Sequence, residues 1–411
     1  MSVTPASSSS SSCPAWLAER LRAVGGSVSF ARYMDWALHD PVHGAYGSGR
    51  LQVGPRGDFA TSPSLGPQFA RLLAPQIADW LAQLPEAGPL ALVEAGPGEG
   101  DLAADLAGAL ASGWPQLAAR LELVLIEPNA GMAARQRQRL AACPLPVRWS
   151  TVAELAAVPV VGVLLAHEVL DALAVERVEW DGAHWRRQLV ALDAGAAAEP
   201  SLRLVPGEPL QPDTDAALWS QLQTRGLLAI TASVPPRLPL GWTTELQAGV
   251  EPWMREAATA LQRGVLLVVD YALEAHRYNS ASRCQGTLMA YRGQQACGDP
   301  LLEPGHWDLT AHLCLECLDA AATASGWQTL GQRRQGEALL ALGLAEQLHG
   351  LQQSPPQELA AALAAREALL RLVDPAGLGD FRWIAFGRTA AEAASVPLFL
   401  QDPCPSVVDR R

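Results

Sequence analysis

One short stretch of the chain alternates carboxylates with glycines, and these residues are the best placed to do chemistry. The apolar run from Leu90 to Val93 is followed by Glu94 and by three glycines, Gly96, Gly98 and Gly100. Glycine permits positive φ angles and lets a ligand lie against the main chain. The Ala/Leu-rich helical pattern that follows would offer free N–H groups at its N-terminus. This order predicts a strand, a tight loop and a helix that bind a nucleotide at the carboxyl end of the strand.

The glycine spacing bears on which nucleotide is bound. A dinucleotide fingerprint has glycines at positions 1, 3 and 6, whereas here the third glycine is at position 5 and Asp101 stands at position 6. Pro97 and Glu99 add bulk and negative charge beside any pyrophosphate. A cationic donor without phosphates, S-adenosylmethionine, therefore fits better, and a nicotinamide dinucleotide is the alternative.

A second acid occupies the matching place on the next predicted strand. Leu121 to Ile126 is followed by Glu127 and Pro128. A carboxylate at this position can accept both ribose hydroxyls of the donor, while Glu94 faces its amino acid end. The sequence thus predicts two carboxylates at neighbouring strand ends, one for each half of the ligand.

A loop rich in Gly, Asp, Thr and Ser precedes this region. It includes Gly57 to Pro63 and lies between two predicted helices, Phe30 to Leu38 and Phe69 to Leu84. The loop is either an ordinary surface loop or a lid over the cofactor, and as a lid it would bring Thr61 and Ser62 to the ligand. The cofactor-binding residues we expect are Thr61, Ser62, Glu94, Gly96, Gly98, Gly100, Glu127 and Pro128.

The candidate catalytic residues follow the apolar strand predicted at Val160 to Ala166. They are His167, Glu168 and Asp171. The two acids are three residues apart, so both can point from the first turn of a helix toward the opening of the same ligand site. There they could cap the helix, or they could bind a guanidinium and orient one of its nitrogens toward a methyl donor. His167 could bond the substrate or accept a proton, or it could be structural.

The alternation of strands and helices predicts an α/β fold with a Rossmann-like doubly wound sheet, an N-terminal helical cap and an insertion after the fourth strand. We expect a fifth strand at Gly264 to Tyr271, two more at Trp327–Arg333 and Phe381–Arg388, and helices at 336–350 and 356–372. Asp308 is expected to cap a helix from Leu309 to Ser325. The expected segments are a disordered Ser-rich tail (1–15), the cap and lid loop (16–88), the first half of the core (89–174), the insertion (175–250), the second half with helical additions (251–390) and a C-terminal tail (391–411).

Composition limits the kinds of partner. The 411 residues carry a net charge of −12, which argues against nucleic acid as a partner. The seven cysteines are scattered and odd in number, as expected for reduced thiols. We expect no membrane insertion and no secretory signal, hence a cytoplasmic protein. Cys314 and Cys317 near His312 lack a second CxxC, so we expect core side chains and no metal.

A series of motifs in one order resembles the MidA-like family of class I S-adenosylmethionine-dependent methyltransferases, and it extends over about residues 28–385. The motifs are Phe30–Met34, Asp40–Gly44, Gly57–Pro63, Glu94–Gly100, Glu168–Leu173, Asp270–Tyr271, Gly286–Leu288 with Tyr291–Arg292, Asp308–His312 and Asp374–Gly379.

The resemblance implies methyl transfer to an arginine guanidino nitrogen of a protein, giving symmetric dimethylarginine. A respiratory dehydrogenase subunit, of the complex I-like NADH dehydrogenase type, is the implied substrate, and a homodimer is one option for the assembly state. The chain departs from the family pattern at Glu99 and Asp101, at His167, at Ala272 and at Gln294. Two other functions stay open: an assembly chaperone that binds adenosylmethionine with little catalysis, and an NAD-dependent oxidoreductase.

Overall fold

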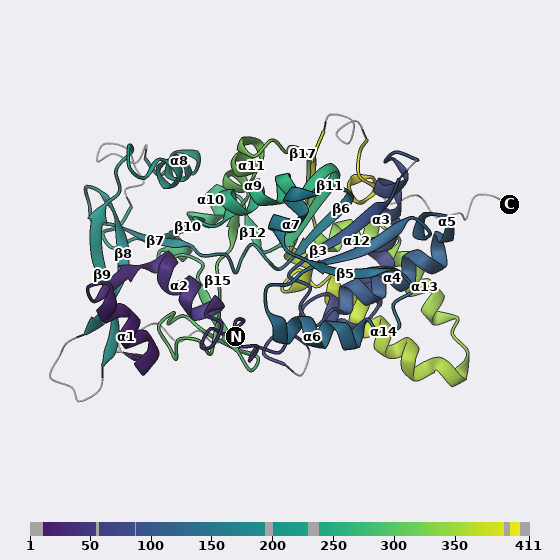
Figure 1. Cartoon of the computed structure of the whole chain (residues 1–411), viewed down its shortest axis with the longest axis horizontal. Coiled ribbons are helices and arrows are strands. Elements are labelled where there is room, and N and C mark those ends of the chain that lie inside the picture. Colours follow the sequence, from purple (N-terminus) through teal and green to yellow (C-terminus); the bar gives the residue numbers. More distant parts are fainter. Residues whose placement is uncertain are drawn as a thin grey trace.

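The computed structural model describes residues 11–54, 57–86, 88–193, 200–228, 238–389 and 395–402. Figure 1 shows two parts: a large sheet with helices on both faces, and a smaller sheet accompanied by the N-terminal helices. No helix in the described ranges is long and apolar enough to cross a membrane.

The large sheet has seven strands in the order β17-β18-β11-β6-β3-β4-β5. Strands β11, β6, β3, β4 and β5 run parallel, and β18 is antiparallel to both of its neighbours. The strands are β3 (Leu90–Ala95), β4 (Leu121–Ile126), β5 (Val147–Ser150), β6 (Val160–His167), β11 (Leu261–Asp270), β17 (Gln328–Arg334) and β18 (Arg382–Gly387). The expected Rossmann-like methyltransferase sheet is therefore confirmed.

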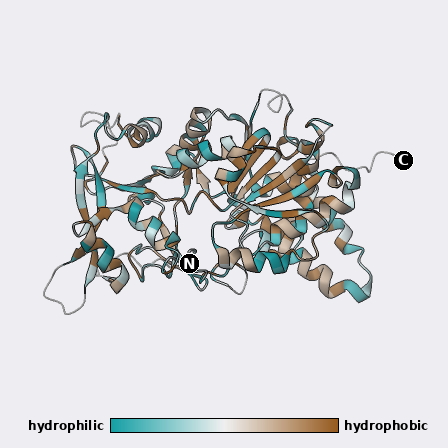
Figure 2. Cartoon of the chain, viewed as in Figure 1, coloured by the Kyte–Doolittle hydropathy of each residue, from teal (hydrophilic) through white to brown (hydrophobic). Residues whose placement is uncertain are grey.

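Both faces of this sheet are covered, which explains why its central strands are apolar at successive positions. Leu90 and Leu92 of β3 face one core, and Ala91 and Val93 face the other, as the two-residue period of a strand requires. Figure 2 shows the hydrophobic strands gathered between the helices. The first core receives α3 (Gln68–Ala82), α4 (Asp101–Gly113), α12 (Gln335–Ala341) and α14 (Leu359–Leu372), and the second receives α7 (Val152–Ala157), α9 (Val250–Ala260) and α11 (Leu315–Ala324).

The smaller sheet combines the insertion with the N-terminal segment. Its order is β1-β9-β8-β7-β10, and β2 also pairs with β8; all these pairs are antiparallel. Residues 1–10 of the expected N-terminal tail lie outside the described ranges, but Ser11 and Ser12 form β1. The elements are β1 (Ser11–Ser12), α1 (Ala15–Ala23), β2 (Ser27–Ser29), α2 (Phe30–His39), β7 (Glu176–Trp180), β8 (Trp185–Asp193), β9 (Ser201–Pro209), α8 (Ala216–Thr224) and β10 (Thr243–Leu246).

The helix expected after Asp308 is wrong in its first part. Asp308 begins a strand, β15 (Asp308–Thr310), which pairs with β13 (Met289–Arg292), and α11 starts only at Leu315. Between them β16 (Leu313–Cys314) pairs with β12 (Ala272–Leu273), so strand pairing outweighs the local helical pattern. The remaining elements include α5 (Pro115–Ala118), α6 (Ala130–Arg139), α10 (Ala275–Tyr278), β14 (Gln295–Cys297) and α13 (Leu344–Gln352).

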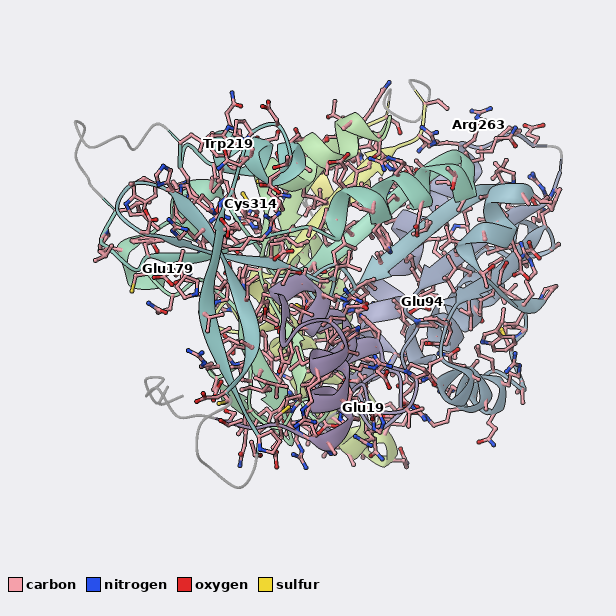
Figure 3. The ribbon with its side chains drawn as sticks, turned by 60° about the vertical axis from the view of Figure 1, so that its left-hand side comes forward. Glu19, Glu94, Glu179, Trp219, Arg263 and Cys314 are labelled. Atoms are coloured by element: carbon pink, nitrogen blue, oxygen red, sulfur yellow. The ribbon has the colours of Figure 1, made fainter. Side chains whose placement is uncertain are left out.

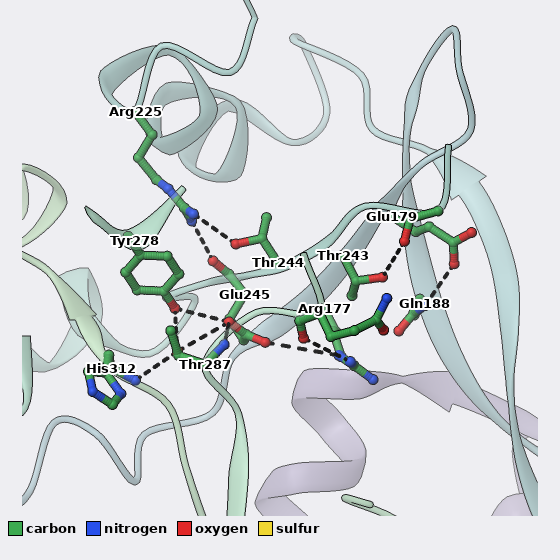
Figure 4. Close-up of polar contacts among 12 residues, drawn as sticks. Arg177, Glu179, Gln188, Arg225, Thr243, Thr244, Glu245, Tyr278, Thr287 and His312 are labelled. Carbon is green, nitrogen blue, oxygen red and sulfur yellow. Dashed lines mark hydrogen bonds and ion pairs between the residues drawn. The ribbon is translucent and has the colours of Figure 1, made fainter. Parts of the chain in front are cut away.

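A buried polar network joins the insertion to the second half of the core (Figure 4). Glu245 of β10 is fully buried, and its Oε2 accepts hydrogen bonds from the Tyr278 hydroxyl at 3.0 Å and the Thr287 backbone N–H at 2.9 Å. Arg177 of β7 brings its Nε within 4.0 Å of Oε1. Gly286 has φ +83°, and a Cβ there would lie 1.9 Å from the same carboxylate. The Gly-Thr-Leu motif at 286–288 therefore serves the packing of this network.

Candidate active site

A cavity of about 790 Å³ lies at the carboxyl ends of β3, β4 and β6. Figure 3 labels Glu94 where the N-terminal segment comes against the large sheet. One wall comes from these strand ends and the loops after them, and the facing wall comes from residues 39–64. Among the described residues that line the cavity, none is Arg or Lys. The described part of the wall thus offers no arginine or lysine side chain to a pyrophosphate.

The glycine loop has the backbone geometry that its sequence predicts. Gly96 and Gly98 line the cavity with φ +60° and +53°, a region that other residues rarely adopt. A Cβ on Gly96 would also lie 3.1 Å from Val169 Cγ2. Gly100, in contrast, is not on the cavity wall: it has φ +85° and is the N-cap residue of α4. The structure gives Gly100 a role in starting the helix, and its contact with the ligand stays a prediction.

Glu94 is the second-last residue of β3 and is 4 % exposed, and its Oε2 has no hydrogen-bond partner in the described part of the chain. Burial raises its pKa to about 8, and the charge of Asp101 adds to the increase. A buried carboxylate with one oxygen unpartnered favours a cation beside it. Glu94 lines the cavity, so it can receive an ammonium or sulfonium group.

Glu127 and Pro128 follow β4 and also line the cavity. Glu127 Oε1 accepts the Asn129 N–H at 2.8 Å, and Oε2 accepts Gln136 Nε2 at 3.0 Å. Burial raises the pKa of Glu127, and these two hydrogen bonds oppose that rise. The carboxylate is thus held in one orientation with acceptor capacity left over, as a pair of ribose hydroxyls would need.

Gln136 of α6 joins the two halves of this site, and no sequence pattern indicates its role. It is fully buried, and its Nε2 donates both to Glu127 and to the Gly98 carbonyl at 2.8 Å. Its Oε1 accepts the Trp149 indole N–H at 2.9 Å. A polar residue in the middle of an otherwise polar helix has no distinguishing pattern, so only the fold reveals it.

The loop before α3 covers the cavity, as its interpretation as a lid requires. Thr61 lines the cavity, but Ser62 does not; its hydroxyl is buried and paired with the Gln335 amide at 3.0 Å. The Asp58 carboxylate and carbonyl accept the backbone N–H groups of Gly293 at 3.0 Å and Gln294 at 2.8 Å. Gln294, one of the departures from the family pattern, also donates to the Gly57 carbonyl at 2.9 Å. It therefore helps to hold this loop in place.

The unusual acids of the glycine loop have partners on α6. Glu99 forms a two-pronged ion pair with Arg135, with N–O distances of 2.9 and 3.0 Å. Asp101 accepts Arg139 Nε at 2.8 Å. The negative charge that these residues add is therefore neutralised beside the cavity by the neighbouring helix.

His167 and Glu168 line the cavity next to β6, and Asp171 does not. Glu168 has φ +52°, which is unusual for a residue with a side chain and is typical of functional sites. Its Oε1 lies 3.5 Å from His167 Nδ1 and has no hydrogen bond among the described residues. Burial lowers the pKa of His167 to about 3, so the ring is neutral. It packs edge-on against Phe69, with ring centroids 5.3 Å apart.

Asp171 lies behind Glu168 in a group of buried carboxylates with Asp270 and Asp308. Burial raises the pKa of Asp171 to about 7 and that of Asp308 to about 8. Burial, followed by the charges of the other three acids, raises the pKa of Glu168 well above its ordinary value. Such a group is ready for a cationic ligand, because a cation would relieve both the burial of charge and the repulsion.

These features define a class of protein. A methyltransferase that uses S-adenosylmethionine typically has a seven-stranded Rossmann-like sheet, a glycine loop and carboxylates at two strand ends, and this chain has all three. The sequence profile of the family described as "Putative S-adenosyl-L-methionine-dependent methyltransferase" matches residues 72–333. The chain belongs to this family, which confirms both the expected enzyme class and S-adenosylmethionine as the cofactor.

Known proteins similar to this chain agree with that assignment. A structure described as a "likely methyl transferase from Burkholderia thailandensis bound to S-adenosyl-homocysteine" is 29 % identical, with a TM-score of 0.80 and 94 % of each chain covered. The protein arginine methyltransferase NDUFAF7 homolog, mitochondrial, of Drosophila melanogaster is 28 % identical over 96 % of this chain and 90 % of its own length. The NDUFAF7 protein of Danio rerio is 27 % identical over 72 % of this chain and 68 % of its own.

These relatives correct one expectation. The proteins from Drosophila melanogaster, Danio rerio and Mus musculus are all named mitochondrial. The cytoplasmic location expected from the N-terminal composition is therefore wrong. A Ser-rich, acid-poor beginning is poor evidence for that location, because transit peptides have a similar composition.

Proposed function

We propose that this methyltransferase transfers a methyl group from S-adenosylmethionine to a guanidino nitrogen of arginine in a protein substrate. The observation that carries the proposal is the set of buried carboxylate oxygens at and behind Glu168 that have no hydrogen-bond partner in the described ranges, namely Glu168 Oε1, Asp171 Oδ1 and Asp308 Oδ1. A planar cation with several N–H donors matches such a site. The relatives named as protein arginine methyltransferases support the same acceptor.

In this mechanism the donor lies along the cavity between two carboxylates. Glu94 pairs with the ammonium group of its amino acid end, Gly96 and Gly98 let it lie against the backbone, and Glu127 with Pro128 holds the ribose. The bound donor supplies a methyl group already activated by the sulfonium. The residues of the chain therefore contribute mainly by position and by exclusion of water, with Thr61 on the covering loop.

Glu168 would orient the guanidinium so that one nitrogen faces the methyl group. The N–C bond forms as the S–C bond breaks, and the proton that leaves the attacking nitrogen passes to a carboxylate of the Glu168 group. The neutral His167 ring, whose Nε2 has no hydrogen-bond partner in the described residues, supports Glu168 from the side. In this arrangement Asp171 acts from behind Glu168 through its charge.

A transfer assay with tritiated donor tests the proposal. We expect label to enter an acetylated and amidated peptide with one arginine, to be absent when that arginine is lysine, and to be lost in Glu168→Gln. Asp213→Asn removes a charge from an exposed turn outside the cavity wall and should transfer label normally. Transfer that survives Glu168→Gln would overturn the residue assignment, and transfer to lysine alone would overturn the acceptor.

Two outcomes would point to the other functions. Tight binding of S-adenosylhomocysteine in calorimetry without transfer to any arginine peptide would favour an assembly chaperone, and micromolar binding of NAD alone would favour an oxidoreductase. The family resemblance nominates a subunit of a complex I-like dehydrogenase as the natural acceptor. Incubation of candidate subunits with tritiated donor tests that choice, and light scattering tests for a homodimer.

A further inference from the structure

The turn that follows α2, which we call the 40–49 turn after its residues, is fixed to the end of that helix. The backbone N–H groups of Tyr46 and Gly47 donate to the Leu38 carbonyl at 2.9 and 3.0 Å. A Cβ on Gly47 would lie 2.1 Å from the Asp40 carbonyl oxygen, so only glycine fits at this position. The 40–49 turn therefore has one compact shape and moves together with α2.

The 40–49 turn lies against the N-terminus of α6 at an edge of the donor cavity. Its residues 46–48 line the cavity, and so do Pro128 and Asn129, which follow β4. A Cβ on Gly49 would lie 3.8 Å from Arg135 Nη1 of α6, so the turn packs closely on that helix. Because both segments line the cavity and contact each other, their contact closes the cavity along this edge.

Asn129 makes the polar contact between the two segments and uses both polar atoms of its side chain. Its Nδ2 donates to the Tyr46 carbonyl at 3.1 Å and to the Gly47 carbonyl. Its Oδ1 accepts the Met132 N–H at 2.8 Å as the N-cap of α6. Its backbone N–H donates to Glu127 Oε1 at 2.8 Å. One residue therefore joins the 40–49 turn, α6 and the carboxylate that we assign to the ribose.

Helix capping alone does not explain an asparagine at position 129. Ser, Asp and Asn are about equally good N-cap residues, because each offers a side-chain oxygen to the first N–H groups of the helix. Of these three, only asparagine also carries an NH2 group, which has two N–H donors. In this chain the NH2 group meets two successive backbone carbonyls of the 40–49 turn. The asparagine is therefore matched to two partners at once, the helix and the turn.

We propose that Asn129 is a positioning residue that holds the 40–49 turn over the bound donor and so slows donor release. The proposal rests on the donor placement in the proposed function, with the ribose at Glu127, and is independent of the methyl acceptor. For the donor to leave along this edge, the 40–49 turn must separate from α6, which breaks both hydrogen bonds of Asn129 Nδ2. Loss of these two bonds should therefore speed donor release while the helix cap stays intact.

The release of S-adenosylhomocysteine, measured by surface plasmon resonance, tests the proposal in Asn129→Ser and Asn129→Ala. The serine variant keeps an N-cap oxygen but lacks the NH2 group, whereas the alanine variant lacks both. We expect the dissociation rate to rise about tenfold in both variants, while Tm falls only in the alanine variant. The association rate should not fall in the serine variant.

The matched control is Gln353→Ser. Gln353 is the exposed C-cap residue of α13, and its amide contacts His349 outside the cavity wall. This variant also exchanges an amide side chain for a hydroxyl, and it should release S-adenosylhomocysteine at the wild-type rate.

The outcomes separate this proposal from its foundation. A wild-type dissociation rate in Asn129→Ser, with Glu127→Gln weakening S-adenosylhomocysteine binding, overturns the role of Asn129 and leaves the donor placement standing. Faster release together with a Tm as low as that of Asn129→Ala also overturns the role, because the residue is then structural. A wild-type Kd in Glu127→Gln overturns the donor placement, and the role of Asn129 falls with it.

Discussion

Substitution of Glu94 by Gln should stabilise the ligand-free protein and weaken its donor binding. Glu94 is buried at the end of β3 with one oxygen unpartnered in the described structure, and its pKa rises from an ordinary 4.5 to about 8. Glutamine has nearly the same shape and never ionises. The two effects have opposite signs, because the charge that is unfavourable in the empty site is the one that a cationic donor needs.

The size of the stability effect follows from the pKa. Below about pH 4.5 the carboxyl is neutral in the folded and the unfolded chain, so its full contribution to stability is present. As the pH rises toward 8, the unfolded chain releases the proton while the folded chain keeps it, and stability falls. Each tenfold change in proton affinity is worth about 1.4 kcal/mol, so the wild-type protein loses at most about 5 kcal/mol relative to the Gln variant.

Chemical denaturation at pH 5, 7 and 9 measures this difference. Glu94→Gln should be more stable than the wild-type protein by less than about 1 kcal/mol at pH 5, by up to about 3 kcal/mol at pH 7, and by up to about 5 kcal/mol at pH 9. The matched control Glu256→Gln, on the exposed face of α9, should show no such trend. A Glu94→Gln difference that is constant with pH would refute the reasoning.

The same variant should bind the donor product less well. A hydrogen bond or ion pair to a charged group is worth about 1.5–3 kcal/mol, so Kd for S-adenosylhomocysteine should rise by roughly 10- to 150-fold. Calorimetry at pH 7 measures it, and an unchanged Kd would show that Glu94 does not contact the ligand.

Three further substitutions test other parts of the structure. Gly98→Val places a branched side chain at φ +53° in the donor cavity and should abolish measurable S-adenosylhomocysteine binding; calorimetry that finds the wild-type Kd would exclude the loop as the donor site. Gln136→Leu removes the hydrogen bonds to Gly98 and Glu127 and should raise that Kd about tenfold, whereas an unchanged Kd would exclude a positioning role. Gly286→Ala forces a Cβ against the Glu245 carboxylate and should lower the free energy of unfolding by at least about 2 kcal/mol; a denaturation midpoint equal to that of the wild type would contradict the packing described for the network.

The features that the sequence predicts well are those built from neighbouring residues. The strand before Glu94, the glycine loop and the helix after it are encoded within 24 consecutive residues, from Leu90 to Gly113. The strand that ends in His167 is recognisable because every position before the histidine is apolar or glycine, as burial on both faces demands. Such local signals place Glu94, Glu127 and Glu168 at one edge of the sheet.

The features that the sequence predicts poorly depend on distant partners or on interrupted patterns. Strand β9 contains Pro206, Gly207 and Pro209, which hide its alternation, and it pairs with β8 through an irregular register. Asp308 has the sequence pattern of a helix cap, but in the structure it lies in β15, which pairs with β13. The hydrogen-bond partner of Ser62 is Gln335, which is 273 residues away in the sequence. No local sequence pattern predicts such a contact.

The contacts of the covering loop determine the stage of protein synthesis at which the donor site can form. Asp58 is held by Gly293 and Gln294, which lie 235 residues or more further along the chain. A nascent chain can therefore complete the large sheet as far as β6 on the ribosome and still lack the residues that fasten its loop. Folding that depends on such long-range contacts is slow, so high-affinity donor binding should come late in synthesis and would mark a finished molecule.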